Sequence, residues 1–141
     1  MSRRGTVWLT IILIICIGGF IGYRMYNKPF PKLSENAVKV TATQLFNDFK
    51  TNDSAAQAKY VPEKLDSKTL EITGEIKDTG QNADGEKFYL LHTGDELFGV
   101  KCSMEKGNEI ANAKPGDKVV IRGFCTGYNM DVVVHRCQQI K

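Results

Sequence analysis

The sequence predicts a mainly β domain, a small closed barrel of five strands in Greek-key order, preceded by a short pair of helices and by an N-terminal transmembrane helix. Three observations support this prediction. The nineteen residues 5–23 carry no charge. From residue 69 apolar and polar side chains alternate, as a half-buried strand requires. Beyond that strand, turn signals rich in glycine divide the chain into further short apolar segments.

Residues 6–26 are predicted to anchor the chain in a membrane, behind a short tail of residues 1–5. As a helix, the uncharged stretch would span roughly 28 Å, close to the thickness of a bilayer's hydrocarbon core. A cleaved signal peptide is the alternative, but bulky residues up to Tyr23 stand where a signal peptidase needs small ones. Cys16 follows Ile15 rather than the small residue of a lipid-attachment site. We therefore expect an uncleaved anchor that crosses the membrane once.

The same segment carries predictions about orientation and pairing. Basic residues flank it on both sides, but a short N-terminal tail before a long C-terminal domain is typical of a signal anchor. We therefore place residues 33–141 outside the cytoplasm. Gly18 and Gly22 form a G-x-x-x-G pattern, which lets two membrane helices approach closely. A weak homodimer through these two glycines is a further prediction.

A linker is predicted at residues 27–40, and the folded domain at residues 41–141. Pro29 and Pro31 make the linker short and stiff, because proline disfavours helix both at its own position and at the preceding residue. The sequence therefore predicts one folded domain that a short linker joins to the membrane anchor.

Two short helices at residues 41–60 are expected to cap one end of the barrel. Thr41 or Thr43 would cap the first helix, and Asn52 with Asp53 would end it and begin the second. The first helix has an apolar stripe at spacings of three and four, which consists of Leu45, Phe46 and Phe49.

Five strands are predicted in the remainder of the domain. A short helix at residues 107–113 and a turn at residues 114–117 separate the third strand from the fourth. Five short strands with the longest connection in this place are the plan of the OB-fold, a small Greek-key barrel. The predicted strands are residues 69–77, 87–93, 97–104, 118–124 and 131–140.

The charge of the domain differs from that of the whole chain. The chain has 19 basic and 16 acidic residues, but five of the basic ones lie within the first 32 residues, before any acid. The remaining 14 against 16 leave the domain with a net charge of −2. Nonspecific binding of nucleic acid depends on cations that neutralise phosphates, so this balance disfavours nucleic acid as the partner.

Several short motifs are spread in order along the domain. They are TATQLF at residues 41–46, EITG at 71–74, GVKC at 99–102, KPGD at 114–117, IRG at 121–123, CTG at 125–127 and DVVV at 131–134, followed by Cys137. Over residues 39–140 these motifs resemble those of the tRNA anti-like family of bacterial OB-fold proteins. The resemblance implies an OB-fold, an envelope location through a lipid or membrane anchor, and nucleic-acid binding, but it supplies no catalytic residues. With the anchor, it predicts a bacterial inner-membrane protein.

The three cysteines of the domain predict a disulfide, since an extracytoplasmic location favours one. Cys125 with Cys137 would close the last hairpin and stabilise the domain by roughly 3 kcal/mol. Cys102 with Cys137 is the alternative, because the third and fifth strands of such a barrel are neighbours. The spacing of the cysteines and of His92 and His135 does not fit a zinc site, so we expect no metal and no other cofactor.

A nucleic-acid surface on an OB-fold would combine aromatic rings for base stacking with cations for phosphates. The candidate ligand-binding residues of this kind are Lys87, Tyr89, Lys101, Arg122, Tyr128 and Arg136. Acidic residues at positions 71, 75, 78, 84 and 86 lie on or beside the same part of the barrel. The six candidates could therefore equally be ordinary strand and surface residues.

No cluster of titratable groups converges in the sequence, so we do not expect an enzyme. The function we expect is a membrane-tethered binding module that holds an envelope protein or a small ligand through its loops. The alternative is a protein that binds single-stranded nucleic acid at the membrane. The two differ in whether the candidate cations share one face with Tyr89 and Tyr128.

Overall fold

The computed structural model describes residues 3–27, 32–64 and 68–140, and the chain forms two units, residues 1–31 and 32–141. Helix α1 (Arg3–Tyr26) makes up most of the first unit. Its stretch Gly5–Tyr26 has a mean hydropathy of 2.2, so by length and composition it could cross a membrane. Lys28, Pro29 and Pro31 of the predicted linker, and the side chains of Arg3 and Arg4, lie outside the described residues.

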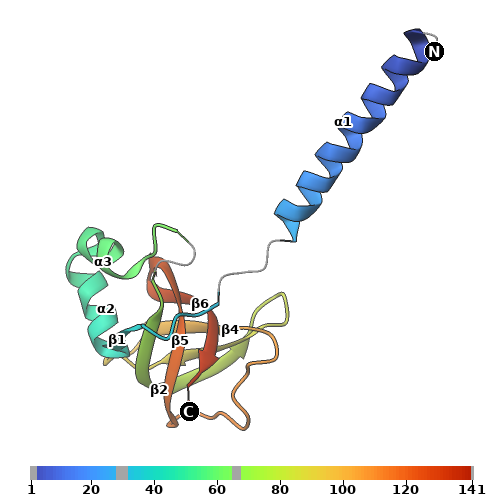
Figure 1. The fold of residues 1–141 in the computed structure, drawn as a ribbon. Coiled ribbons are helices and arrows are strands. Elements are labelled where there is room, and N and C mark those ends of the chain that lie inside the picture. Colours follow the sequence, from blue (N-terminus) through green and yellow to red (C-terminus); the bar gives the residue numbers. More distant parts are fainter. Residues whose placement is uncertain (1–2, 28–31, 65–67, 141) are drawn as a thin grey trace. The chain divides into compact units, whose positions relative to one another are not determined.

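The second unit contains a closed β-barrel, which confirms the predicted OB-fold (Figure 1). β4 and β6 run parallel, and the other neighbouring barrel strands are antiparallel. In their order around the barrel the strands are β2 (Leu70–Gln81), β3 (Lys87–Leu91), β4 (Val100–Met104), β6 (Asp131–Gln139) and β5 (Lys118–Asn129), and β5 pairs with β2 again.

One long strand closes the barrel. The first half of β2 pairs with β5, from Leu70 opposite Gly123 to Glu75 opposite Lys118. Its second half pairs with β3 instead, and the register shifts between Ile76 and Asp78. Such a bulge bends a strand, which lets β2 turn from one neighbour to the other.

Two strands are longer than predicted, since β2 continues past residue 77 and β5 past residue 124, and two elements differ in kind. A sixth strand, β1 (Val38–Thr41), pairs in parallel with the start of β2, although residues 38–40 were predicted to belong to the linker and residue 41 to the helical cap. The predicted helix at residues 107–113 is wrong. This segment contains turns, and the backbones of Gly107 and Asn112 have φ angles of 90° and 56°, which a right-handed helix excludes.

The predicted helical cap is confirmed as α2 (Ala42–Thr51) and α3 (Asp53–Tyr60). The Thr41 hydroxyl accepts a hydrogen bond from the backbone of Gln44 at the start of α2. Asn52 ends α2 and begins α3, because its backbone N–H donates to a carbonyl of α2 while its side chain accepts from the backbone of Ala55. Both caps satisfy backbone groups that a helix end leaves open.

The cap packs on the barrel through aromatic rings. The ring of Tyr128 on β5 lies 6.0 Å, centre to centre, from both Phe46 and Phe49 of α2. The Tyr60 hydroxyl of α3 donates a 2.5 Å hydrogen bond to the Asp48 carboxylate of α2 and so ties the two helices together. This bond lowers the pKa of Asp48, while burial raises the pKa of Tyr60. The buried core that the cap and the barrel share includes Leu45, Leu70, Ile72, Leu91, Val100, Ile121, Val132 and Val134.

Candidate ligand-binding surface

The outer surface of the barrel carries a half-buried aromatic ring beside a lysine. On β3 the side chains of Tyr89 and Leu91 point into the barrel and are buried, so the alternate residue Phe88 points outward. The Phe88 ring lies against Gly80 of β2, where a β-carbon would collide with it. The ammonium group of Lys101 on β4 lies 4.3 Å from the ring centre, a cation–π geometry. We call Phe88 and Lys101 the Phe88 platform.

Tyr89, the aromatic residue that the sequence analysis placed on this surface, has an exposed fraction of only 3%. Its hydroxyl accepts a hydrogen bond from the backbone N–H of Ile110, 3.2 Å away, and lies 3.4 Å from the carbonyl oxygen of the same residue. The ring therefore supports the segment between β4 and β5 from within and is not open for stacking.

Three other candidates also have structural partners. The Arg122 guanidinium on β5 contacts the Glu71 carboxylate of β2 through two nitrogen atoms, each 2.9 Å from the same oxygen. Tyr128 packs against the helical cap. Arg136 lies on β6 with a φ angle of 54° and has interactions of its own. Arg122 and Arg136 lie near each other on the paired strands β5 and β6, where the register shifts between Arg122 and Phe124.

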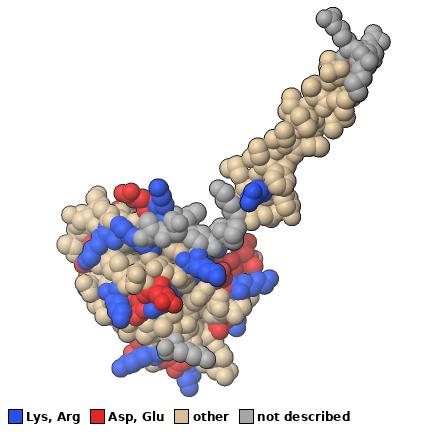
Figure 2. Space-filling view, viewed as in Figure 1, with Lys and Arg blue, Asp and Glu red and all other residues tan. Residues whose placement is uncertain are grey.

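Basic residues do not form a patch of their own on the face of the domain that Figure 2 shows. Figure 2 shows Lys and Arg side chains interspersed with Asp and Glu over the visible face. Lys50 and Lys59 pair with Asp95 and Asp48, at 3.3 Å each. The arrangement that would favour nucleic acid needs both tyrosines open on one face with the candidate cations, and the burial of Tyr89 does not fit it.

Two loops at one end of the barrel expose large apolar side chains. Leu97, between β3 and β4, has an exposed fraction of 76%, and Met130, between β5 and β6, has 62%. The Asp131 carboxylate joins the loops, because it accepts a 2.8 Å hydrogen bond from the backbone of Gly99. Met130 has a φ angle of 68°, in the left-handed region that residues other than glycine rarely adopt. We call Leu97 and Met130 the apolar tips.

A sequence model of the tRNA anti-like family matches residues 1–139. The chain belongs to this family. The resemblance read from its motifs is thereby confirmed, and the barrel described above is the OB-fold of a tRNA anti-like protein. No curated protein sequence matches the chain.

Solved structures with a similar fold include a candidate nucleic acid-binding lipoprotein from Klebsiella pneumoniae, with 13% identity and a TM-score of 0.51 over 73% of this chain and 92% of that one. The structure of yeast Stn1 and Ten1 has 13% sequence identity and a TM-score of 0.47, and the match covers 79% of this chain and 66% of that one. The structure of the OBody AM3L09 bound to hen egg-white lysozyme has 16% sequence identity and a TM-score of 0.38, and the match covers 60% of this chain and 92% of that one. The first similarity supports the fold alone, and the other two are too distant to add to it.

The predicted disulfide of this tRNA anti-like domain is wrong, because Cys102, Cys125 and Cys137 are free thiols. In the β5–β6 pairing Cys125 lies opposite Val134, three residues from Cys137, so the first predicted bridge does not fit the register. In the alternative pair, Cys137 lies opposite Met104 of β4 rather than opposite Cys102. Burial raises the pKa of Cys125 to about 11, and it also raises the pKa of Cys137, beside the Cys102 thiol.

The described part of the chain contains no group of three or more His, Cys, Asp or Glu side chains placed to hold a metal ion. The imidazole of His92 instead accepts a hydrogen bond from the backbone of Gly94. Sequence reasoning missed Phe88 because the run KFYLL at residues 87–91 has four apolar residues in succession, so alternation does not show which of them face outward. The exposed position of the apolar tips had no sequence signal, since isolated apolar residues in loops are common.

Proposed function

We propose that this protein is a non-enzymatic binding module of a bacterial inner membrane, anchored by residues 6–26 with its domain outside the cytoplasm, and that it binds an envelope protein or a small ligand through its loops. The observation that carries the proposal is the pair of apolar tips. Large exposed apolar side chains on neighbouring loops favour a protein partner, since apolar contacts at an interface exclude water.

The backbone at Met130 adds support. A left-handed conformation costs a residue with a β-carbon roughly 1 kcal/mol, and glycine or asparagine would adopt it at lower cost. Contact between the Met130 side chain and a partner would explain why a strained backbone position carries an exposed methionine. Methionine is also suited to a binding surface, because its side chain is flexible and polarizable.

A photoreactive residue at position 97 tests the proposal in cells. We expect a discrete cross-linked adduct from position 97, because Leu97 would contact the partner directly. The matched control is position 84, at the tip of the β2–β3 hairpin, which lies at the other end of β3. Equal adducts from both positions, or none from position 97, would contradict the use of this surface.

The anchor and its orientation have a separate test. The apolar stretch Gly5–Tyr26 is what supports a membrane location. Protease added to intact spheroplasts should degrade the domain, and the protein should stay with the membrane after washing with carbonate. Protection of the domain from the protease would reverse the proposed orientation. Pairing of two helices through Gly18 and Gly22 stays a prediction.

A second candidate function is binding of single-stranded nucleic acid, and the Phe88 platform is what favours it. Stacking of a base on an exposed ring is worth about 1–3 kcal/mol, and Lys101 adds a cation beside the ring. The family, and the function suggested for the Klebsiella lipoprotein, point the same way. The net charge of −2 favours the first proposal.

Fluorescence anisotropy of labelled single-stranded DNA and RNA separates the two functions, with the full chain in detergent micelles. For a protein-binding module we expect no binding even at low salt. Micromolar binding that weakens steeply with salt, and that Phe88→Ala abolishes, would instead establish the nucleic-acid function. Lys39→Gln is the matched control, because Lys39 is an exposed lysine on β1, away from the platform.

A further inference from the structure

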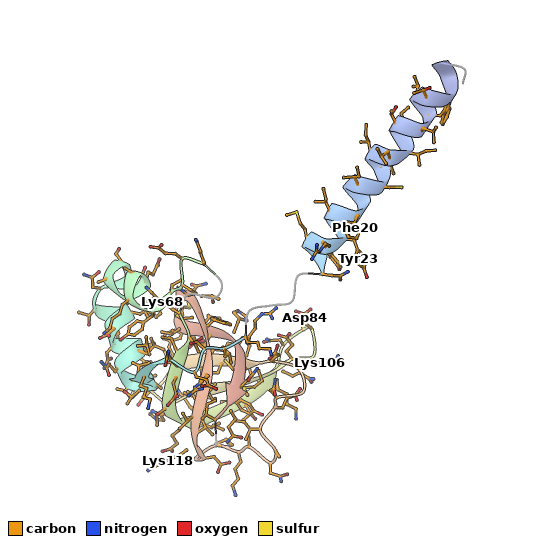
Figure 3. The ribbon with its side chains drawn as sticks, in the orientation of Figure 1. Phe20, Tyr23, Lys68, Asp84, Lys106 and Lys118 are labelled. Atoms are coloured by element: carbon orange, nitrogen blue, oxygen red, sulfur yellow. The ribbon has the colours of Figure 1, made fainter. Side chains whose placement is uncertain are left out.

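A cleft of about 460 Å³ opens between the β2–β3 hairpin and the segment that joins β4 to β5. In Figure 3 the labelled residues Asp84, in the hairpin, and Lys106, in the joining segment, lie at the same end of the domain. The volume falls in the range of small-molecule sites, about 300–1,000 Å³. The cleft is lined by Thr79, Gly80, Gln81, Lys87, Tyr89, Ile110, Asn112 and Ala113.

The wall of the cleft is held in place from the core. Tyr89 is buried, and its hydroxyl is hydrogen-bonded to the backbone of Ile110. Further along, the Asp117 carboxylate accepts a hydrogen bond from the backbone of Lys114, which closes the turn before β5. The segment that joins β4 to β5 is therefore held in place on either side of its lining residues, at Ile110 and at Lys114. A ligand would meet a largely preformed site.

The lining of the cleft has one charge, the ammonium group of Lys87. Lys87 and Tyr89 lie two residues apart on β3, so their side chains share one side of the strand. The side chain of Lys87 is exposed and has no ion pair or hydrogen bond within the described residues. A lysine side chain without a partner, in a cleft that the partly buried Ile110 and Ala113 also line, matches a ligand that combines a negative charge with an apolar body.

Polar side chains around Lys87 can add donors. The Asn112 amide has no hydrogen bond within the described residues, and the Thr79 hydroxyl lines the same cleft. Gln81 donates its amide N–H to Gly85, which holds this side chain in place. Three separate donor groups, from Lys87, Asn112 and Thr79, suit the several oxygen atoms of a phosphate better than the two of a carboxylate.

The neighbouring acids lie outside the lining. Asp78 accepts a hydrogen bond from the backbone of Thr79, and Glu109 accepts one from the backbone of Gly107. Asp84 and Glu86 belong to the hairpin loop and are exposed. The residues that line the cleft therefore carry one positive charge and no negative one, although the domain as a whole is negative.

We propose that this cleft binds the phosphate group of a small phosphomonoester, with the phosphate at Lys87 and Asn112 and the apolar body against Ile110 and Ala113. The inference rests on the proposed binding function and names a class for its small ligand. A terminal phosphate of a nucleic-acid strand has the same chemistry, and the experiment separates the two sources.

Isothermal titration calorimetry of the full chain in detergent micelles, with phenyl phosphate as the probe, tests the proposal. We expect saturable binding of phenyl phosphate and none of phenol, which lacks the charge. Lys87→Gln should weaken binding about tenfold or more, because it removes a charge-assisted hydrogen bond. Asn112→Gly keeps the left-handed backbone and should weaken binding several-fold. Lys39→Gln, at an exposed lysine outside the cleft, should leave binding unchanged.

Equal affinities of the Lys87→Gln and Lys39→Gln variants would overturn the proposal, as would the absence of saturable binding. Unchanged melting temperatures of the variants exclude a loss of folding as the cause. An oligonucleotide with a 5′-phosphate that binds more tightly than phenyl phosphate, in a Lys87-dependent way, would support the cleft and assign the phosphate to a strand end. A cross-link at position 97 without phosphate binding would refute the cleft and leave the proposed function standing.

Discussion

The contact between Arg122 and Glu71 allows a quantitative test of whether a predicted ligand residue is structural. The two residues lie directly opposite each other on β5 and β2, and the exposed fractions of their side chains are 21% and 14%. Unit charges about 4 Å apart attract by about 4 kcal/mol at an effective dielectric constant of 20. Desolvation of two half-buried groups cancels much of this, and exposed pairs reach only about 0.2–1 kcal/mol. We therefore expect a coupling free energy of about 1–2 kcal/mol.

A double-mutant cycle in urea measures this coupling, with Glu71→Gln, Arg122→Gln and the double variant of the full chain in detergent micelles. The next cross-strand pair of opposite charge, Glu75 and Lys118, is the matched control, because it lies on the same two strands without an ion pair in the described structure. Its coupling should be near zero. If the free energies of the Arg122 cycle add within about 0.3 kcal/mol, the contact does not stabilise the fold and the guanidinium would be available to a ligand.

Three further predictions concern single side chains. Tyr60→Phe should lower the free energy of unfolding by about 1–2 kcal/mol at pH 7 in urea, because a hydrogen bond to a carboxylate is lost. That bond lowers the pKa of Asp48, so its stabilisation is present above the ordinary carboxyl pKa and should fade as the pH falls below about 4. Met130→Gly should raise the free energy of unfolding by about 0.5–1 kcal/mol in a thermal melt, because glycine adopts a positive φ without strain. Gly99→Ala should lower it by about 1–3 kcal/mol, because the added β-carbon would collide with the Leu91 carbonyl oxygen.

Each of these predictions has an outcome that would contradict it. A Tyr60→Phe effect that is the same at pH 7 and pH 3 would mean that the carboxylate is not the acceptor. A lower melting temperature for Met130→Gly would show that the methionine side chain stabilises the free domain. A Gly99→Ala variant as stable as the parent would mean that the loop can move away from Leu91.

Local signals predicted the parts of the fold that depend on local chemistry. Thr41 and Asn52 accept hydrogen bonds at helix starts, and this capping role is readable from the residue types alone. The alternation of apolar and polar side chains likewise predicted strand β2, because one side of this strand is buried and the other is not. Strand β1 was missed because its four residues are held by pairing with a strand thirty residues further along.

The errors in the candidate site come from register and tertiary contacts. The helix expected at residues 107–113 had apolar residues at a helical spacing, Ile110 and Ala113. In the structure Ile110 is instead bound to the Tyr89 hydroxyl, and Asn112 adopts a left-handed backbone. A shift of one residue on β3 exchanges Tyr89 for Phe88 as the outward aromatic, and an apolar run does not show which is right.

The buried thiols make the domain convenient for site-specific labelling. Maleimide reagents attack accessible thiolates, but Cys102, Cys125 and Cys137 have exposed fractions of at most 1%, and burial keeps the thiols of Cys125 and Cys137 protonated at neutral pH. Among the four cysteines of the chain, only Cys16 in α1 is exposed. Once Cys16 is replaced by serine, a single new cysteine can carry a fluorophore or spin label without any change to the barrel's interior.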